Sequence, residues 1–468
     1  MPPASSRQSL DPADLSAAEL LDLYARRSLS PVEVMQAVIA RVEAWEPKLK
    51  ALYAFDPDRA LREAHASERR WLQGDARPLD GVPATLKENI ATRGTPVPLG
   101  TAARPLEPAA EDAPPTARLS EDGAIVFAKT TMPDYGMLSS GLSSFHPLTR
   151  NPWDLSRTPG GSSAGAGAAA AAGYGPFHVG TDIGGSIRLP AGWCGVFGLK
   201  PSLGRVPIDP PYYGRVAGPI TRTVADAALM MRSLSRPDRR DTMSLPPQDL
   251  PWLDLAIEVK GLRLGLMMEA GVGLDLDAEV RLVVEEAADT FAAAGAVVEP
   301  VAPFITRAML DGLDDFWRQR AWAEMARLAD EERGRILPYI RSWAERGRSL
   351  NGVQVYRGMD QMMAMRHAAV AASAGFDFVL SPVSPVPAFA AELASPIHDP
   401  ERPFEHIGYT VAFNMSEQPA ASVNAGYTRT GLPVGLQIVG QRFDDVGVLR
   451  LGRAFENLRG PQRPWPTP

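Results

Sequence analysis

Three short segments of this 468-residue chain hold side chains that could together activate a hydroxyl group. Two are rich in glycine and serine: Thr158–Gly167, and Gly180–Pro190, in which paired glycines precede Ser186. The third, Gly81–Asn89, carries Lys87 at the end of an apolar stretch. A serine hydroxyl becomes a nucleophile when a base removes its proton, and a lysine can be that base when its amine is neutral. These segments together predict nucleophilic catalysis by a serine.

Each segment alone has an ordinary structural explanation: a tight turn before an alanine-rich helix, a glycine-rich turn, or a surface lysine at a strand end. The chain has six lysines, however, at positions 48, 50, 87, 129, 200 and 260, so a lysine base has few candidates. Paired glycines before a serine can present consecutive backbone N–H groups to a developing oxyanion. Burial of Lys87 beside an apolar strand would favour the neutral amine, because desolvation disfavours the ammonium form.

The order and spacing of these segments resemble the amidase signature family. The likeness extends from about residue 30 to residue 455 and is carried by the segments Gly160–Ser163, Gly180–Ser186, Cys194–Pro201, Gly218–Ala228 and Gly431–Gln437. The resemblance implies an α/β fold with a large mixed twisted β-sheet flanked by helices on both faces. It also implies hydrolysis of amide-type C–N bonds through an acyl-enzyme, with no cofactor and no metal. The substrate classes include amides, anilides, aryl carbamates (urethanes) and esters.

The resemblance also assigns roles to individual residues. Ser186 would be the nucleophile, Lys87 the base, and Ser162 the bridging serine, joined to Gly161 by a cis peptide bond. The oxyanion hole would consist of four backbone N–H groups, those of Ile183, Gly184, Gly185 and Ser186.

Aromatic and apolar residues are predicted to line the substrate pockets. They lie on loops near the catalytic segments and are Met137, Leu138, Trp153, Tyr212 and Tyr213. These loops show no cluster of charges, which favours uncharged aryl or hydrophobic groups over small charged amides. The aromatic residues of the stretch 305–372 are expected to pack helices against the sheet instead.

Three alternatives stay open. An amidotransferase subunit that releases ammonia from glutamine for a partner would share the same signature. An α/β-hydrolase-type esterase would use Gly161–Gly165 as its G-x-S-x-G elbow, with Ser163 as nucleophile and a histidine as base, but an elbow requires a strand directly before it. The preceding segment, Asn151–Pro159, has two prolines and no apolar run. A non-catalytic binding protein is disfavoured by the intact set of Lys87, Ser162 and Ser186.

Strands that end beside one another must bring these segments together. Val82–Lys87 and Ala124–Ala128 have the apolar character of buried strands. Residues 262–301 have a strand–helix–strand pattern, which indicates parallel strands. Strands that alternate with helices in this way predict a sheet between layers of helices.

The domain organisation follows from the same pattern. Residues 1–75 are predicted to form a helical segment packed on the core, and residues 76–468 to form the core itself. Residues 305–372 are a helical insertion that could form a lid. The whole chain is expected to be one structural domain.

Composition limits the range of functions. The formal net charge of −7 suggests neither a nucleic-acid partner nor an anionic membrane. There is no secretory signal pattern, no apolar run of about 18 residues and no metal-ligand spacing among six histidines. The single cysteine, Cys194, cannot form an internal disulfide. We therefore expect a cytoplasmic enzyme with a small-molecule substrate, and a homodimer is an open possibility for its assembly.

Overall fold

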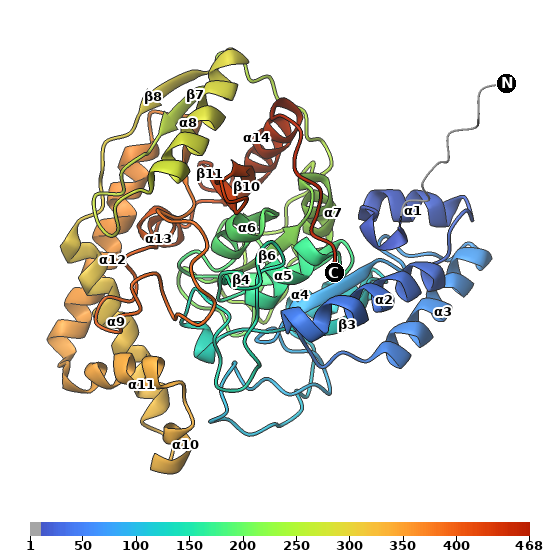
Figure 1. Ribbon diagram of the computed structural model, residues 1–468, viewed down its shortest axis with the longest axis horizontal. Coiled ribbons are helices and arrows are strands. Elements are labelled where there is room, and N and C mark those ends of the chain that lie inside the picture. Colours follow the sequence, from blue (N-terminus) through green and yellow to red (C-terminus); the bar gives the residue numbers. More distant parts are fainter. Residues whose placement is uncertain (1–10) are drawn as a thin grey trace.

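The computed structural model describes residues 11–468, and within them eleven strands form one mixed sheet with helices on both faces (Figure 1). This confirms the predicted fold class. The strands follow the spatial order β1-β3-β2-β4-β6-β5-β10-β11-β9-β7-β8. Their bounds are β1 (Leu52–Tyr53), β2 (Pro83–Lys87), β3 (Ile125–Thr130), β4 (Phe177–Asp182), β5 (Phe197–Lys200), β6 (Val216–Thr221), β7 (Arg263–Leu266), β8 (Val297–Pro300), β9 (Phe378–Pro382), β10 (Ala420–Tyr427) and β11 (Pro433–Val439).

Fourteen α-helices lie within the described residues. Their bounds are α1 (Ala17–Ala25), α2 (Pro31–Leu49), α3 (Pro57–Gln73), α4 (Pro114–Glu121), α5 (Ala164–Ala172), α6 (Arg188–Cys194), α7 (Val224–Leu234), α8 (Ala278–Ala293), α9 (Arg307–Met325), α10 (Asp330–Gly334), α11 (Pro338–Glu345), α12 (Gly352–Ser373), α13 (Gly408–Met415) and α14 (Asp445–Leu458).

Residues 11–75 are largely helical, as predicted, and local signals start the first two α-helices. Ser16 and Glu19 form a reciprocal capping box at α1, and Ser30 and Glu33 form another at α2. Each box satisfies backbone N–H groups that the first helical turn leaves unpaired. Helices α1, α2 and α3 lie together at one side of the molecule, near the β1–β3 end of the sheet (Figure 1).

Alternate residues of single strands face opposite helical layers. On β9, Phe378 and Leu380 join a core formed with α7, α8 and α14, whereas Val379 joins the core formed with α9, α12 and α13. This is the two-residue period of a strand that is buried on both faces. The predicted strand–helix–strand unit is β7–α8–β8, whose two strands are parallel.

Helix α5 lies very close to its neighbours because its residues are alanine and glycine. A Cβ atom built at Gly165 would lie 2.1 Å from the Ala51 carbonyl oxygen and 2.5 Å from the Thr131 nitrogen. A larger side chain at this position would therefore push α5 away from the sheet. Since Ser162 and Ser163 directly precede α5, this close packing also sets their position.

The central strands bring the predicted catalytic segments to one edge of the sheet. Strand β2 is parallel to β4, with Leu86 paired to Val179. Strand β2 ends at Lys87, and β4 ends at Asp182, just before the loop that holds Ser186. The carboxyl ends of adjacent parallel strands are the usual position of an α/β active site.

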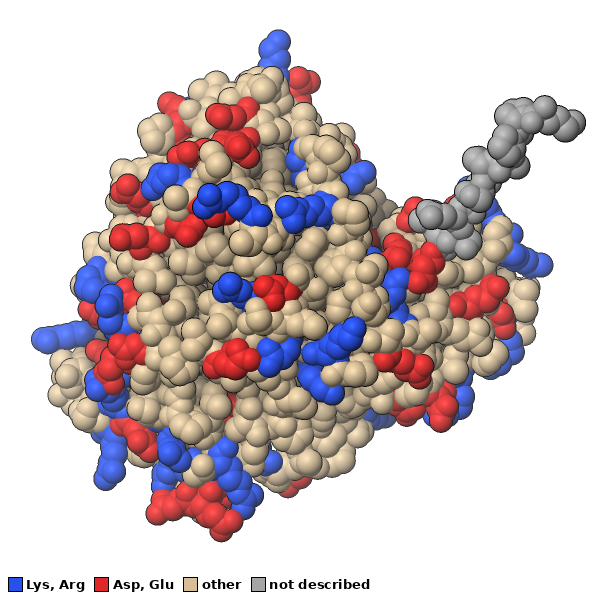
Figure 2. Space-filling view, viewed as in Figure 1, with Lys and Arg blue, Asp and Glu red and all other residues tan. Residues whose placement is uncertain are grey.

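The stretch predicted as a helical insertion is helical from α9 to α12. Helices α9 and α12 pack against each other along much of their length and lie beside α13 (Figure 1). No helix within residues 11–468 is both long and apolar enough to cross a membrane. Basic and acidic side chains are interspersed on the face shown in Figure 2, without a large area of one sign.

Candidate active site

Lys87 is the centre of a buried hydrogen-bond cluster. Its side chain is fully buried at the end of β2, and its Nζ lies 2.8 Å from Ser162 Oγ and 3.0 Å from Ser163 Oγ. The predicted burial of Lys87 and its contact with Ser162 are therefore confirmed. The peptide bond between Gly161 and Ser162 is cis, also as predicted.

The two serines beside Lys87 have different surroundings. Ser163 Oγ also donates to the Thr181 carbonyl and accepts from the Thr181 N–H, both at 3.2 Å. Its hydroxyl thus makes three hydrogen bonds within the protein, and the side chain is fully buried. Ser162 Oγ has Lys87 as its hydrogen-bond partner. Of the two serines, Ser162 is the one that can exchange a proton with a substrate.

Electrostatics favour a neutral Lys87. Burial lowers the pKa of Lys87 well below the ordinary lysine value, and the nearby charge of Arg215 lowers it further. Asp182 and Glu88 raise the pKa, but these effects are smaller. A neutral amine has a free lone pair, so Lys87 can accept a proton from Ser162.

Ser186 lies on the loop between β4 and α6 and is partly exposed. The Asp182 carboxylate shapes this loop, because it accepts hydrogen bonds from the N–H groups of Gly185 at 2.8 Å and Ile187 at 3.0 Å. Gly185 has a φ of +128°, a conformation that few other residues adopt. Thr410 on α13 donates to the Gly184 carbonyl at 2.6 Å. The position of Ser186 is therefore set from two sides.

A buried arginine supports this loop. Arg188 and Asp182 form an ion pair at 2.9 Å, and both side chains are fully buried. Arg188 also donates to Gln437 on β11 and to Asn414 on α13. Burial acts to raise the pKa of Asp182, but the Arg188 charge and hydrogen bonds outweigh it, so the pKa lies below its ordinary value. Sequence reasoning missed these supporting residues, although Arg188 follows Ser186 by two positions.

Three of the four predicted oxyanion donors are free to bind an oxygen. Within residues 11–468, the N–H groups of Ile183, Gly184 and Ser186 donate to no protein acceptor. The N–H of Gly185 is already engaged by Asp182 Oδ1. The expectation for Gly185 is therefore corrected, because its φ angle turns its N–H toward the carboxylate that shapes the loop.

A mostly apolar pocket opens beside Ser186, and we call it the serine pocket. It is lined by Gly136, Met137, Leu138, Ser139, Ile183, Gly184, Ser186, Trp317, Arg320, Phe404 and Ile407. Two of the predicted binding residues, Met137 and Leu138, are among them. Trp317, Phe404 and Ile407 were not predicted. Trp317 belongs to the aromatic set expected to pack α9, and it both packs there and borders the pocket.

The other three predicted binding residues lie outside the serine pocket. Trp153 packs at a tilt against Tyr427 and Trp465, with ring centroids 5.4 and 6.1 Å away, and donates to the Cys194 carbonyl. Tyr213 donates to the Met415 carbonyl at 2.8 Å. Tyr212 does not border the serine pocket, but it packs against Arg320, which does. The Arg320 guanidinium lies 4.0 Å from the centre of the Tyr212 ring. Trp153 and Tyr213 border neither this pocket nor its neighbouring cavity, and their polar atoms bond to backbone carbonyls elsewhere.

A larger cavity of about 670 Å³ adjoins the serine pocket, and we call it the arginine cavity. It shares Met137, Trp317 and Arg320 with the serine pocket and is also lined by Arg104 and Arg215, among others. The sequence-based expectation of no charge cluster concerned only the loops around the predicted pocket residues, and Arg104 and Arg320 lie outside those loops. These arginines come from separate segments, and tertiary packing gathers them in one cavity.

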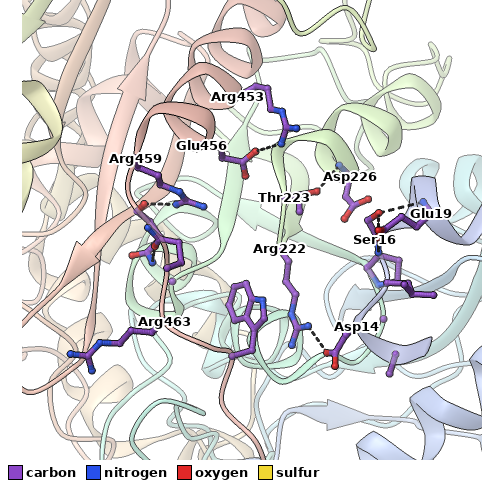
Figure 3. A pocket seen from close by; sticks show the side chains of 18 of the residues that line it. Asp14, Ser16, Glu19, Arg222, Thr223, Asp226, Arg453, Glu456, Arg459 and Arg463 are labelled. Atoms are coloured by element: carbon purple, nitrogen blue, oxygen red, sulfur yellow. Dashed lines mark hydrogen bonds and ion pairs between the residues drawn. The ribbon is translucent and has the colours of Figure 1, made fainter. Parts of the chain in front are cut away.

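A further cavity, of about 360 Å³, lies between the N-terminal helices and the C-terminal segment (Figure 3). None of the three predicted catalytic side chains lines it. Its charges are largely paired with one another: Arg222 bonds Asp14 at 2.6 Å, and Arg453 bonds Glu456 at 3.0 Å. The first pair links the N-terminal segment to the turn after β6, the second lies within α14, and Arg222 also packs on the Trp465 ring near the C-terminus, so the cavity has the features of a structural junction.

The histidines take no part in the serine cluster. Within residues 11–468, no histidine hydrogen-bonds to Ser162, Ser163 or Ser186. His178 bonds to Thr85 and to the Gly175 carbonyl. The segment before Ser163 is a loop, so the strand that a nucleophile elbow requires is missing at this point. In the same described residues, no group of three or more His, Cys, Asp or Glu side chains is arranged to hold a metal ion.

Comparison with known proteins gives consistent results. Residues 33–449 match the family model described as Amidase. The chain is 33% identical to a glutamyl-tRNA(Gln) amidotransferase subunit of Geobacter metallireducens, over 95% of this chain and 97% of that protein. It resembles the crystal structure of a bacterial aryl acylamidase of the amidase signature enzymes, with a TM-score of 0.87 and 31% identity over 95% of this chain and 96% of that one. It also resembles the corresponding amidotransferase subunit of Thermotoga maritima, with a TM-score of 0.77 and 26% identity over 98% of each chain.

Proposed function

Because the chain belongs to the amidase signature family of C–N hydrolases, we propose that it cleaves amide bonds through an acyl-enzyme on Ser186. The observation that carries this proposal is the buried Lys87 amine, 2.8 Å from Ser162 Oγ at the same sheet edge as the Ser186 loop. A lysine held neutral beside a serine hydroxyl has the property that a general base needs.

The proposed mechanism begins with proton transfer. Neutral Lys87 takes the proton of Ser162, and Ser162 in turn takes the proton of Ser186. Ser186 Oγ attacks the substrate carbonyl carbon, and the carbonyl oxygen becomes an oxyanion. Ser162 and Ser186 make no side-chain hydrogen bond in the structure, so this relay requires their hydroxyls to approach each other when substrate binds.

Breakdown of the intermediate completes the reaction. The N–H groups of Ile183, Gly184 and Ser186 stabilise the oxyanion because they have no other acceptor among the described residues. When the C–N bond breaks, Ser162 donates its proton to the leaving nitrogen and recovers one from Lys87. A water molecule then attacks the acyl-enzyme, and its proton passes to Ser162 and from Ser162 to Lys87. The proton returns by the same route to Ser186 when the acid is released.

For the substrate, we propose aryl amides, anilides and aryl carbamates. Met137, Leu138 and Trp317 give the serine pocket an apolar wall suited to an aromatic ring. The likeness to an aryl acylamidase supports the same class.

A second candidate is glutamine hydrolysis as part of an amidotransferase, and the relatives named as glutamyl-tRNA(Gln) amidotransferase subunits support it. Two measurements separate the candidates. Glutaminase activity together with co-purification of partner proteins would favour the amidotransferase. Hydrolysis of neutral anilides by the chain alone, with poor use of glutamine and malonamate, would favour the aryl amidase.

Labelling tests the nucleophile. A fluorophosphonate should form a covalent adduct on Ser186, and the Ser186→Ala variant should be folded, unlabelled and inactive. The matched control is Ser163→Ala, which removes the neighbouring hydroxyl of the cluster. An adduct on Ser163 in the unmodified enzyme would refute the assignment.

A further inference from the structure

The arginine cavity beside Ser186 holds more positive than negative charge, and we propose that it binds a carboxylate on the substrate. The preferred substrates are then aryl amides or aryl carbamates that carry a carboxylate. This inference rests on the proposed function and narrows its substrate class.

The arginine cavity and the serine pocket are continuous. Met137, Trp317 and Arg320 line both of them. Met137 and Trp317 supply apolar surface at this shared border, while Arg320 supplies a positive charge. A substrate with its reacting carbonyl at Ser186 therefore passes an apolar border before it reaches the arginines. An aryl group followed by a carboxylate matches this sequence of surfaces.

Arg215 gives the strongest indication that the arginine cavity binds an anion. Its side chain is mostly buried, yet it forms no ion pair and no hydrogen bond with residues 11–468, and its Nε is completely buried without a partner. Burial lowers the pKa of Arg215 to about 10, and the Arg320 charge also acts to lower it, whereas the more weakly acting carboxylates of Asp209, Asp241 and Glu324 act to raise it. A desolvated cation that no carboxylate contacts directly is unfavourable, so this side chain would gain from an anionic ligand.

Arg188 shows how this fold treats a buried arginine that has a structural role. Arg188 is fully buried and bonds to Asp182, Asn414 and Gln437. Arg215 has no such set of partners, although its side chain is also largely removed from solvent. The contrast indicates that Arg215 is kept for a ligand and not for the core.

The rest of the cavity adds to the positive charge. Four arginines line it (Arg104, Arg215, Arg320 and Arg327), against two carboxylates (Asp209 and Glu324), so the formal surplus is two positive charges. Arg320 lies on the face of the Tyr212 ring, and its Nε is 3.7 Å from Glu324. A ring on one side holds a guanidinium in place while leaving its N–H groups directed outward. The planar fork of N–H donors on a guanidinium matches a carboxylate in geometry.

Matched substrate pairs test the proposal on the whole protein. In one pair the carboxylate is on the leaving group: para-acetamidobenzoate against the neutral para-acetamidobenzamide. In the other it is on the acyl group: N-phenylsuccinamate against N-phenylsuccinamide. The release of the aromatic amine gives kcat/KM for each compound. We expect the compound that carries the carboxylate to have the higher kcat/KM in one of the two pairs.

Variants then locate the preference. Arg215→Gln and Arg320→Gln should each lower the carboxylate-to-neutral ratio of kcat/KM by about tenfold or more, the change expected from loss of a charge-assisted hydrogen bond. Arg348→Gln, an exposed arginine outside the cavity, is the matched control and should leave the ratio unchanged. Calorimetric binding to the Ser186→Ala protein gives the same ratio without turnover. Thermal unfolding of each variant shows that it is folded.

The outcomes distinguish failure of the carboxylate proposal from failure of the proposed function. A wild-type preference for the neutral member of both pairs, or a ratio unchanged in both variants, would overturn the carboxylate proposal and leave the aryl amidase function intact. If no anilide is cleaved and no label reaches Ser186, the proposed function itself fails. A carboxylate preference that depends on Arg215 or Arg320 supports the proposal.

Discussion

Replacement of Lys87 by methionine tests the catalytic base most directly. Methionine fills a similar volume and has no amine, so Ser162 loses its proton acceptor. General bases contribute about 100- to 10,000-fold to rates, and we expect anilide hydrolysis to fall by an amount in this range. In the unmodified enzyme, turnover should rise with pH as Lys87 loses its proton.

The stability of this variant distinguishes a neutral lysine from a charged one. The pKa of Lys87 is lower in the folded protein than in the unfolded chain, where it is near the ordinary 10.5. Between these two pKa values the unfolded chain binds more protons, so the stability of the wild type rises with pH across this window. The slope is about 1.4 kcal/mol for each pH unit.

The lowered pKa of Lys87 also sets how much Lys87→Met changes the free energy of unfolding. Methionine removes the cost of keeping a neutral amine, about 1.4 kcal/mol for each pH unit below 10.5 inside the window. It also loses the two hydrogen bonds from Lys87 to Ser162 and Ser163, worth about 1 kcal/mol each. These effects oppose each other, so Lys87→Met should be no less stable than the wild type at neutral pH. Loss of one partner from a buried charged pair would instead cost about 3–5 kcal/mol.

Urea unfolding of both proteins across a pH series, together with anilide turnover, is the assay. Lys129→Met is the matched control, because Lys129 is also buried, has a pKa lowered to about 7, and makes no contact with the serines. It should likewise gain stability relative to the wild type as the pH falls from 10.5 toward 7, and it should keep its turnover. A Lys87→Met variant that loses several kcal/mol of stability independently of pH would show that Lys87 is not held neutral. A variant that hydrolyses anilides at the normal rate would show that Lys87 is not the base.

Three further predictions concern the surroundings of the site. Asp182→Asn should destabilise the protein by about 3–5 kcal/mol in urea unfolding, because it leaves Arg188 charged and buried without its carboxylate; an unchanged midpoint would contradict this. Trp317→Ala should raise KM for anilides more than for small aliphatic amides in steady-state assays, and equal effects on both classes would remove Trp317 from ring binding. Burial raises the pKa of the Cys194 thiol above its ordinary value, so mass spectrometry should detect iodoacetamide alkylation of the unfolded protein but not of the native one.

Much of the architecture could be predicted because its signals are local. The capping boxes at Ser16 and Ser30 start helices wherever the rest of the chain lies. The apolar runs that became β2 and β3 are buried on both faces and therefore carry a continuous apolar pattern. The catalytic candidates were recognisable for a similar reason, since Lys87 and the glycine-rich serine segments have distinctive residue types in a distinctive order.

Predictions about pocket residues were less successful, because nearness in sequence is a poor guide to nearness in space. Trp153 precedes the first serine segment by a few residues, yet it packs beside Trp465 near the end of the chain. Trp317 is more than a hundred positions from Ser186 and borders its pocket. The N–H of Gly185 was predicted to bind the oxyanion, but the folded loop directs it to Asp182.

The residue types and their short spacings were enough to suggest the proposed chemistry, because a candidate nucleophile, a candidate base and glycine loops are recognisable without the fold. Tertiary structure alone decided what surrounds that chemistry. Arg104, Arg215 and Arg320 lie on three separate segments, and only the packing of α9 and the loops against the sheet places them in one cavity. Charge and burial are collective properties of a folded chain: an arginine becomes an unpaired, desolvated cation only when distant segments have closed around it.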